Sequence, residues 1–192
     1  MAYFPFMIQM EDKLCLIAGG GTIARHKAEM MLSFGARIRL IAPQICKELW
    51  ELAAQTDAFD LHERAVEALD LEGVDVAILA TDDAVVNHRM AQECKRRHIL
   101  VNVVDVKEDC GFYFPALIKQ EDVVVAVSTG GDSPVLASHI KREIAAQMRD
   151  DYGRIARELG DMRQTVLEQT PPGRRKAAFE KLLEERLQDG AE

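Results

Sequence analysis

Short apolar runs alternate with longer amphipathic segments over the first 105 residues of the chain. The apolar runs predict buried strands, and apolar positions three or four apart predict helices. Strands that alternate with helices in this way are typical of an α/β fold with a parallel sheet. The predicted strands cover residues 13–18, 37–42, 59–62, 74–80 and 100–104, and the predicted helices cover 22–34, 45–54 and a segment that begins after Asp83.

The pattern changes after Asp105. Two apolar runs, 112–118 and 123–127, are joined by a polar stretch and predict a hairpin or two neighbouring strands. The end of the strand–helix alternation indicates a second, smaller domain. Amphipathic helices follow, with apolar stripes at Leu136, Ile140, Ile144 and Met148, then at Ile155, Leu159, Met162 and Val166, and finally at Phe179, Leu182, Leu183 and Leu187.

Three glycines lie between the first predicted strand and the first predicted helix. Gly19 supplies a tight turn, Gly21 leaves room for a pyrophosphate against bare backbone, and Ala24 is small enough for the helix to pack on the strand. The first helical turn would then point its N–H groups at the phosphates. This pattern predicts a Rossmann-type dinucleotide site, with a glycine-rich turn that binds no ligand as the alternative.

The second predicted strand ends in Ala42, Pro43 and Gln44. A dinucleotide-binding fold usually carries a carboxylate at this place, which binds the adenosine ribose. Here there is none. Either backbone groups and Gln44 hold the ribose, or the site prefers a different nucleotide.

Polar residues also follow the two later strands of the predicted sheet. Thr81 and Asp82 come after 74–80, at the ligand-facing edge. The alternative is a helix N-cap with an acidic first turn, formed by Asp82 and Asp83, and the two interpretations are compatible. Asp105 follows 100–104 between two valines. We expect its carboxylate to be poorly solvated and its pKa raised, which suits proton transfer. The alternative for Asp105 is a residue that simply forms a turn.

A second glycine-rich loop spans residues 128–134, with Ser133 placed as the N-cap and Pro134 as the first residue of a helix. The loop is either a nest of backbone donors for a carboxylate or phosphate, or a well-capped turn.

Composition narrows the class of protein. The net charge of −8 argues against a nucleic-acid binder, and 48% hydrophobic residues suffice for a core. The sequence lacks an apolar run of transmembrane length and a signal-peptide pattern, so we expect a cytoplasmic protein that does not bind membranes. The cysteine spacing indicates neither a metal site nor disulfides. We expect buried thiols at Cys15 and Cys94 and no role for Cys110, which lies in a loop near the candidate site.

In their order and spacing, these motifs resemble the precorrin-2 dehydrogenase family, which comprises the N-terminal module of bifunctional siroheme synthases and its free-standing relatives. In the bifunctional members a methyltransferase domain follows. Since this chain ends at Glu192, methylation is expected to belong to another protein. The resemblance covers about the first 150 residues and rests on residues 3–5, 19–24 with Arg25 and Lys27, 42–43, 80–83 with Asn87, 102–105, 114–116 and 128–137.

The resemblance implies NAD-dependent oxidation of precorrin-2 to sirohydrochlorin and, in some members, insertion of ferrous iron as a second substrate to give siroheme. It identifies Asp105 as the essential carboxylate. It also implies a homodimer with an NAD-binding Rossmann-type domain (residues 1–112), a small α+β dimerisation domain (113–150) and a C-terminal helical region (151–192). The predicted NAD site consists of Gly19, Gly21, Thr22, Ile23, Pro43, Gln44 and Thr81.

Two other functions fit part of the sequence. A non-catalytic module that senses NAD and reports to a partner would explain the glycine loop, but neither residues 102–105 nor the second glycine-rich loop. A chelatase that has lost the oxidation step is the third interpretation.

Overall fold

The structure is a computed structural model that describes residues 3–189. The chain divides into two compact units, Met1–Tyr113 and Phe114–Glu192, and each is described by itself. The further division at residue 150 stays a prediction. Within the described residues, no helix is long and apolar enough to cross a membrane.

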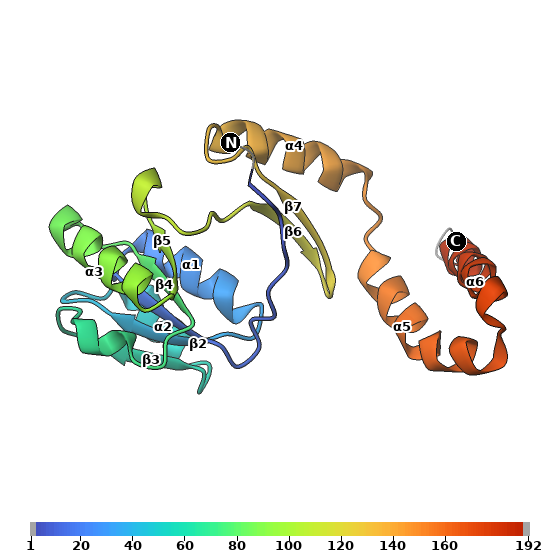
Figure 1. The fold of residues 1–192 in the computed structure, drawn as a ribbon, viewed down its shortest axis with the longest axis horizontal. Coiled ribbons are helices and arrows are strands. Elements are labelled where there is room, and N and C mark those ends of the chain that lie inside the picture. The colour runs from blue at the N-terminus through green and yellow to red at the C-terminus, as the bar shows by residue number, and fades with distance from the viewer. Residues whose placement is uncertain (1–2, 190–192) are drawn as a thin grey trace. The chain divides into compact units, whose positions relative to one another are not determined.

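The first unit contains, within its described residues, a five-stranded parallel sheet with strand order β3-β2-β1-β4-β5 (Figure 1). The chain moves outward from β1 to β3 and then returns to the other side of β1. The strand order therefore reverses between β1 and β4, and ligands bind at such a switch point. The Rossmann-type α/β prediction is confirmed, with β1 at Leu14–Ala18, β2 at Arg37–Ile41, β3 at Phe59–His62, β4 at Val76–Leu79 and β5 at Leu100–Val103.

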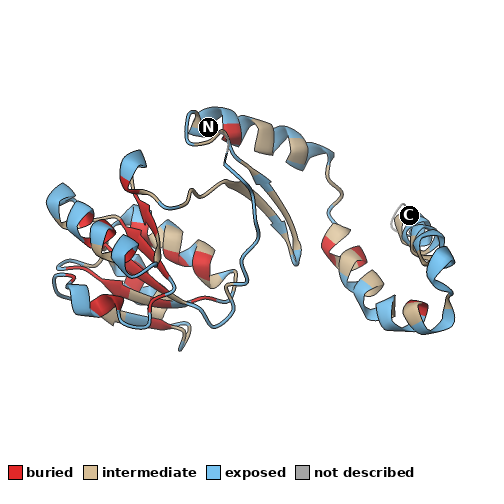
Figure 2. Cartoon of the chain, in the orientation of Figure 1, coloured by how far each residue is buried: buried red, intermediate tan, exposed pale blue. Residues whose placement is uncertain are grey.

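Helices cover both faces of this sheet. The helices α1 (Thr22–Leu32) and α2 (Lys47–Ala53) contact each other on one face. The helix α3 (Ala84–Arg96) covers the other face with the short 3₁₀ helix η1 (Ala68–Leu71). The strands are consequently buried on both faces, as their apolar sequences require (Figure 2).

Apolar side chains of the inner strands pack against α3. Leu16, Ala77 and Val101 belong to one cluster with Met90 and Cys94 of the helix. Burial raises the pKa of the Cys94 thiol to about 11 and that of Cys15, on the other side of the sheet, to about 12. Both thiols therefore stay protonated at neutral pH and behave as small hydrophobic groups.

The second unit begins with an antiparallel hairpin of β6 (Ala116–Gln120) and β7 (Val123–Val127), on which α4 (Pro134–Gln147) packs. The first hairpin strand starts at Ala116, four residues later than the apolar run from 112 predicts. Leu136, predicted on the apolar stripe of α4, is 49% exposed. Further helices follow: α5 (Tyr152–Gln169), the 3₁₀ helix η3 (Pro172–Arg174) and α6 (Arg175–Asp189).

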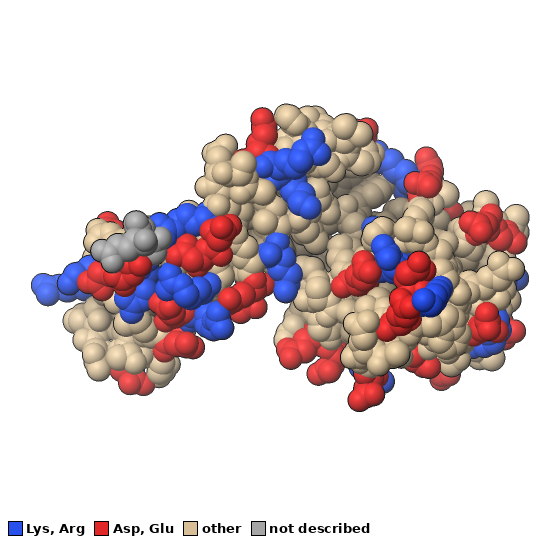
Figure 3. Space-filling model, turned by 180° about the vertical axis from the view of Figure 1, so that it is seen from behind, with Lys and Arg blue, Asp and Glu red and all other residues tan. Residues whose placement is uncertain are grey.

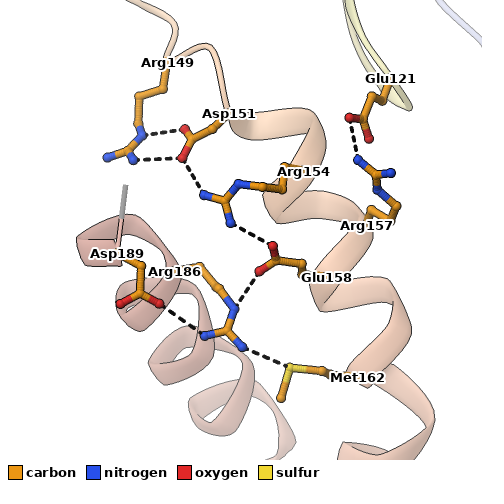
Figure 4. A network of polar contacts seen from close by, with 9 residues as sticks. All are labelled: Glu121, Arg149, Asp151, Arg154, Arg157, Glu158, Met162, Arg186 and Asp189. Carbon is orange, nitrogen blue, oxygen red and sulfur yellow. Dashed lines mark hydrogen bonds and ion pairs between the residues drawn. The ribbon is translucent and has the colours of Figure 1, made fainter. Parts of the chain in front are cut away.

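Ion pairs connect the last two helices (Figure 4). Asp151 accepts hydrogen bonds from Arg149 and Arg154, and Glu158 pairs with both Arg154 and Arg186 of α6. The two arginines hold the pKa of Asp151 at about 2. Lys, Arg, Asp and Glu are interspersed over these helices (Figure 3), so the charged faces neutralise one another locally.

Candidate functional site

The glycine loop between β1 and α1 needs glycine at its first position. Gly19 has a φ of 131°, and a Cβ atom there would overlap the carbonyl oxygen of Ala80 at the end of β4. The Gly19 N–H donates to the carbonyl of Ile41, at 3.0 Å. The turn is therefore held between the ends of β2 and β4, which flank β1 in the sheet.

Gly20 is a second obligatory glycine, which the sequence analysis did not single out. A Cβ atom on Gly20 would overlap the carbonyl oxygen of Gln44, and the Gly20 carbonyl accepts a hydrogen bond from the Cys46 N–H at 2.9 Å. These contacts bring Pro43 and Gln44, both exposed, beside the glycine loop. The available signal was that the middle residue of the three is also glycine, because the dinucleotide fingerprint requires glycine only at the first and last of these positions.

Gly21 is open on the side where a ligand would bind. Within the described residues, a Cβ atom on Gly21 would meet no atom within 4 Å, and no side chain caps α1, of which Gly21 is the N-cap. Thr22 and Ile23, in the first turn, are exposed. By contrast, the Asp83 carboxylate caps α3 through the N–H groups of Val85 and Val86. An open glycine before an uncapped helix fits the pyrophosphate of a dinucleotide.

Thr81 follows β4 and is held by Asn87 of α3. The Thr81 hydroxyl lies 2.7 Å from the Asn87 Oδ1, and the Asn87 amide donates to the Thr81 carbonyl at 2.9 Å. Asn87 is buried, with 6% of its surface exposed. The Asn87 side-chain amide therefore holds Thr81 at the carboxyl edge of the sheet. An amide side chain among the inward-facing positions of α3 was the signal for this contact.

Asp105 lies in the turn after β5, and its backbone is left-handed, with a φ of 61°. The prediction of a poorly solvated carboxylate is wrong, because Asp105 is exposed. The strand ends at Val103, so the buried surroundings of β5 stop before the chain reaches Asp105.

The predicted site residues of the first unit all lie along the carboxyl edge of the sheet. The glycine loop is at the centre, with Pro43 and Gln44 on the β2 side and Thr81 on the β4 side. Asp105 follows β5, one strand beyond β4. His, Cys, Asp and Glu residues of the described chain form no group of three that could hold a metal ion.

The second glycine-rich loop is satisfied within the second unit. The Gly130 N–H donates to the Ser128 hydroxyl, the Ser133 N–H donates to Thr129 Oγ1, and the Leu136 N–H donates to the Ser133 hydroxyl. These contacts favour the well-capped turn over the anion-binding nest. The predicted cap at Ser133 is confirmed.

Comparison with known proteins identifies the family. The sequence model of a family described as "Putative NAD(P)-binding" matches residues 6–116, and one described as "Sirohaem biosynthesis protein central" matches residues 125–147. The chain belongs to this NAD(P)-binding family of siroheme biosynthesis modules. It is 37% identical over 190 residues to the siroheme synthase of Chromobacterium violaceum and 40% identical over 185 residues to that of Methylococcus capsulatus.

These matches cover 98% and 96% of this chain, which spans only 40% and 39% of the two relatives. A solved structure described as "SirC, precorrin-2 dehydrogenase" is similar over 94% of this chain and 89% of its own, with a TM-score of 0.76 and 25% identity. The chain is thus a module similar to a precorrin-2 dehydrogenase.

Proposed function

We propose that this chain catalyses the NAD-dependent oxidation of precorrin-2 to sirohydrochlorin in siroheme synthesis. One observation carries the proposal: the open glycine loop after β1 and the exposed carboxylate of Asp105 after β5 lie on the same edge of the sheet, with only β4 between their strands. The similarity to a precorrin-2 dehydrogenase over nearly the whole chain supports it.

The cofactor in this proposal is NAD. Gly19 and Gly21 give the pyrophosphate access to the backbone, and the N–H groups of Thr22 and Ile23 bind its charge. Pro43 and Gln44 would hold the adenosine half, and Thr81, which is fixed by Asn87, would hold the other half. When bound, the nicotinamide supplies the hydride acceptor.

Asp105 takes the proton that leaves the tetrapyrrole ring. A carboxylate fixed beside the reacting carbon can accept this proton directly, and such a positioned base typically contributes a rate factor of about 10²–10⁴. Because Asp105 is exposed, it can pass the proton on to water. The glycine loop and Asp105 lie on different strands, so binding and proton transfer can be separated by mutation.

The homodimer is also part of the proposal, with a second copy of the chain covering the apolar surface of the second unit. The valines of β7 are only half-buried, and Val135 of α4 is 80% exposed. Apolar surface of this kind marks an interface, and identical chains most often pair by two-fold symmetry.

The direct test is to incubate the protein with precorrin-2 and either NAD or NADP and to record the absorption spectrum of sirohydrochlorin. We expect oxidation with NAD. Binding of NAD without oxidation would instead support the sensing module. Adding ferrous iron to sirohydrochlorin in a parallel reaction tests metal insertion.

A further inference from the structure

Asp105 occupies a backbone conformation that needs support. It is the third residue of a turn in which the Val106 N–H donates to the Val103 carbonyl at a long 3.4 Å. Its φ of 61° lies in the left-handed region, which is unfavourable for a residue other than glycine, although less so for Asp and Asn. The Val104 N–H also donates to the Leu79 carbonyl at 3.0 Å, but the long bond that closes the turn is weak support for a reactive carboxylate.

The Cys110 thiol reinforces both ends of this turn. The Val103 N–H donates to Sγ at 3.3 Å, and the carbonyl oxygens of Val103 and Val106 lie 3.2 and 3.3 Å from Sγ, where either can accept the thiol proton. The amide of Asn102 is also within reach, at 3.5 Å. The sulfur therefore contacts Val103 and Val106, the first and last residues of the turn that carries Asp105.

The thiol is suited to this task because it keeps its proton. Cys110 is half-buried, and burial raises the pKa of its thiol above the ordinary value. At neutral pH the sulfur can thus donate one hydrogen bond and accept others.

The neighbouring residue anchors the same segment to α3. The Asp109 carboxylate is buried and binds His88 at 2.7 Å, with Gln92 at 3.3 Å and Lys95 at 3.5 Å. Because Asp109 fixes the chain next to Cys110, the sulfur is held at a defined place beside the turn. To move the turn, the protein would have to break either the contacts of the Cys110 thiol with the turn or those of Asp109 with α3.

We propose that Cys110 is a positioning residue for Asp105, which sets the direction of the carboxylate by bridging the two ends of its turn. This inference rests on the proposed function, since it assumes that Asp105 reacts with the substrate. It assigns a role to a residue for which the sequence alone predicts none.

The test compares Cys110→Ala, which removes the hydrogen bonds, with Cys110→Ser, which keeps a donor and an acceptor. Cys94→Ala is the matched control, because it removes a buried thiol from the same core without touching the turn. We expect Cys110→Ala to lower kcat by on the order of ten- to a hundredfold through misplacement of the base. The NAD Kd should stay unchanged, Cys110→Ser should restore most of kcat, and Cys94→Ala should lower stability while kcat is kept.

A double-mutant cycle shows whether the effect passes through Asp105. In an Asp105→Asn background, Cys110→Ala should lower kcat no further, because there is no base left to misplace. Three outcomes would each overturn the proposal. They are a kcat in the double variant that falls by the product of the two single losses, an unchanged kcat in Cys110→Ala, and a kcat that Cys110→Ser does not restore.

Amide hydrogen exchange separates this inference from the proposed function. The N–H groups of residues 103–106 should exchange faster in Cys110→Ala than in the wild type and in Cys110→Ser. If the wild type does not oxidise precorrin-2, the proposed function fails, and the exchange rates still decide whether the thiol holds the turn. Unchanged exchange in Cys110→Ala would overturn the inference even in an active enzyme.

Discussion

The carbonyl oxygen of Gln44 fills the space that a Cβ atom on Gly20 would need. One residue further on, Gly21 has no neighbour within 4 Å of its Cβ position in the described chain. Two adjacent glycines therefore have different reasons to be glycine. Gly20 lets two loops pack together, and Gly21 leaves space that a ligand can use.

Replacing Gly21 by valine should remove cofactor binding and spare the fold. The Cβ position of Gly21 lies in open space, with no atom of the described residues within 4 Å, but a branched side chain there blocks approach to the backbone. We expect NAD affinity to fall at least tenfold, or about 1.4 kcal/mol. Titration calorimetry measures the NAD affinity, and an undiminished affinity in Gly21→Val would contradict the placement of the pyrophosphate.

Gly20→Ala is the companion variant. Here the added methyl group meets the Gln44 carbonyl, so the loop must shift, and overpacking of this kind costs about 1–3 kcal/mol of unfolding free energy. Urea denaturation of both variants should show the loss for Gly20→Ala and little change for Gly21→Val.

Asp105→Asn should separate chemistry from binding. Asn tolerates the left-handed backbone about as well as Asp does, so the variant removes the base and keeps the turn. We expect kcat for precorrin-2 oxidation to fall by about 10²–10⁴ with the NAD Kd nearly unchanged.

Asp12→Asn is the control for this change, because Asp12 is exposed and left-handed as well, with a φ of 60°, but lies in the turn before β1 at the opposite edge of the sheet. It should leave kcat at the wild-type value. If Asp105→Asn also oxidises precorrin-2 at the wild-type rate, Asp105 is only a turn residue. If iron insertion is measured in the wild type, its loss in Asp105→Asn would mean that one carboxylate serves both reactions.

The Arg64–Asp70 pair predicts a pH dependence of stability. Arg64 donates to both carboxylate oxygens of Asp70, at 2.8 and 2.6 Å, and these bonds hold the pKa of Asp70 below its ordinary value of 3.8. A lowered pKa stabilises the fold above the pKa of the unfolded state, and this contribution is lost as the pH falls through the folded-state value.

Asp70→Asn should therefore lower the unfolding free energy by about 1 kcal/mol at neutral pH, since Arg64 is partly exposed. The difference from the wild type should shrink below about pH 4, where the wild-type carboxyl begins to protonate. Urea denaturation across this range measures it, with the exposed Asp57→Asn as control. A difference that does not change with pH would contradict the charge-based explanation.

Light scattering at micromolar concentration should give twice the 21.5 kDa mass of the chain. The half-buried hairpin and the exposed Val135 should be covered in such a dimer. Val135→Glu places a charge on this surface and should shift the protein toward the monomer. A monomeric wild type would contradict the proposed pairing.

Local sequence patterns determined most of the secondary structure of this protein. Buried strands read as short apolar runs, and Ser133 before Pro134 identified the start of α4. The glycine motif after β1 predicted the turn and the Rossmann-type fold, because both depend on residues adjacent in the chain.

Only the tertiary structure decided which distant residues meet and which are exposed. It placed Gln44 against Gly20, paired Thr81 with Asn87, exposed Asp105, and brought the Cys110 thiol between Val103 and Val106. Periodicity reports which face of an element is apolar, but it carries no information on how a turn bends or which carbonyl lies across it. These contacts depend on strand order and on one left-handed backbone angle, so the surroundings of the candidate base could not be predicted from its flanking valines.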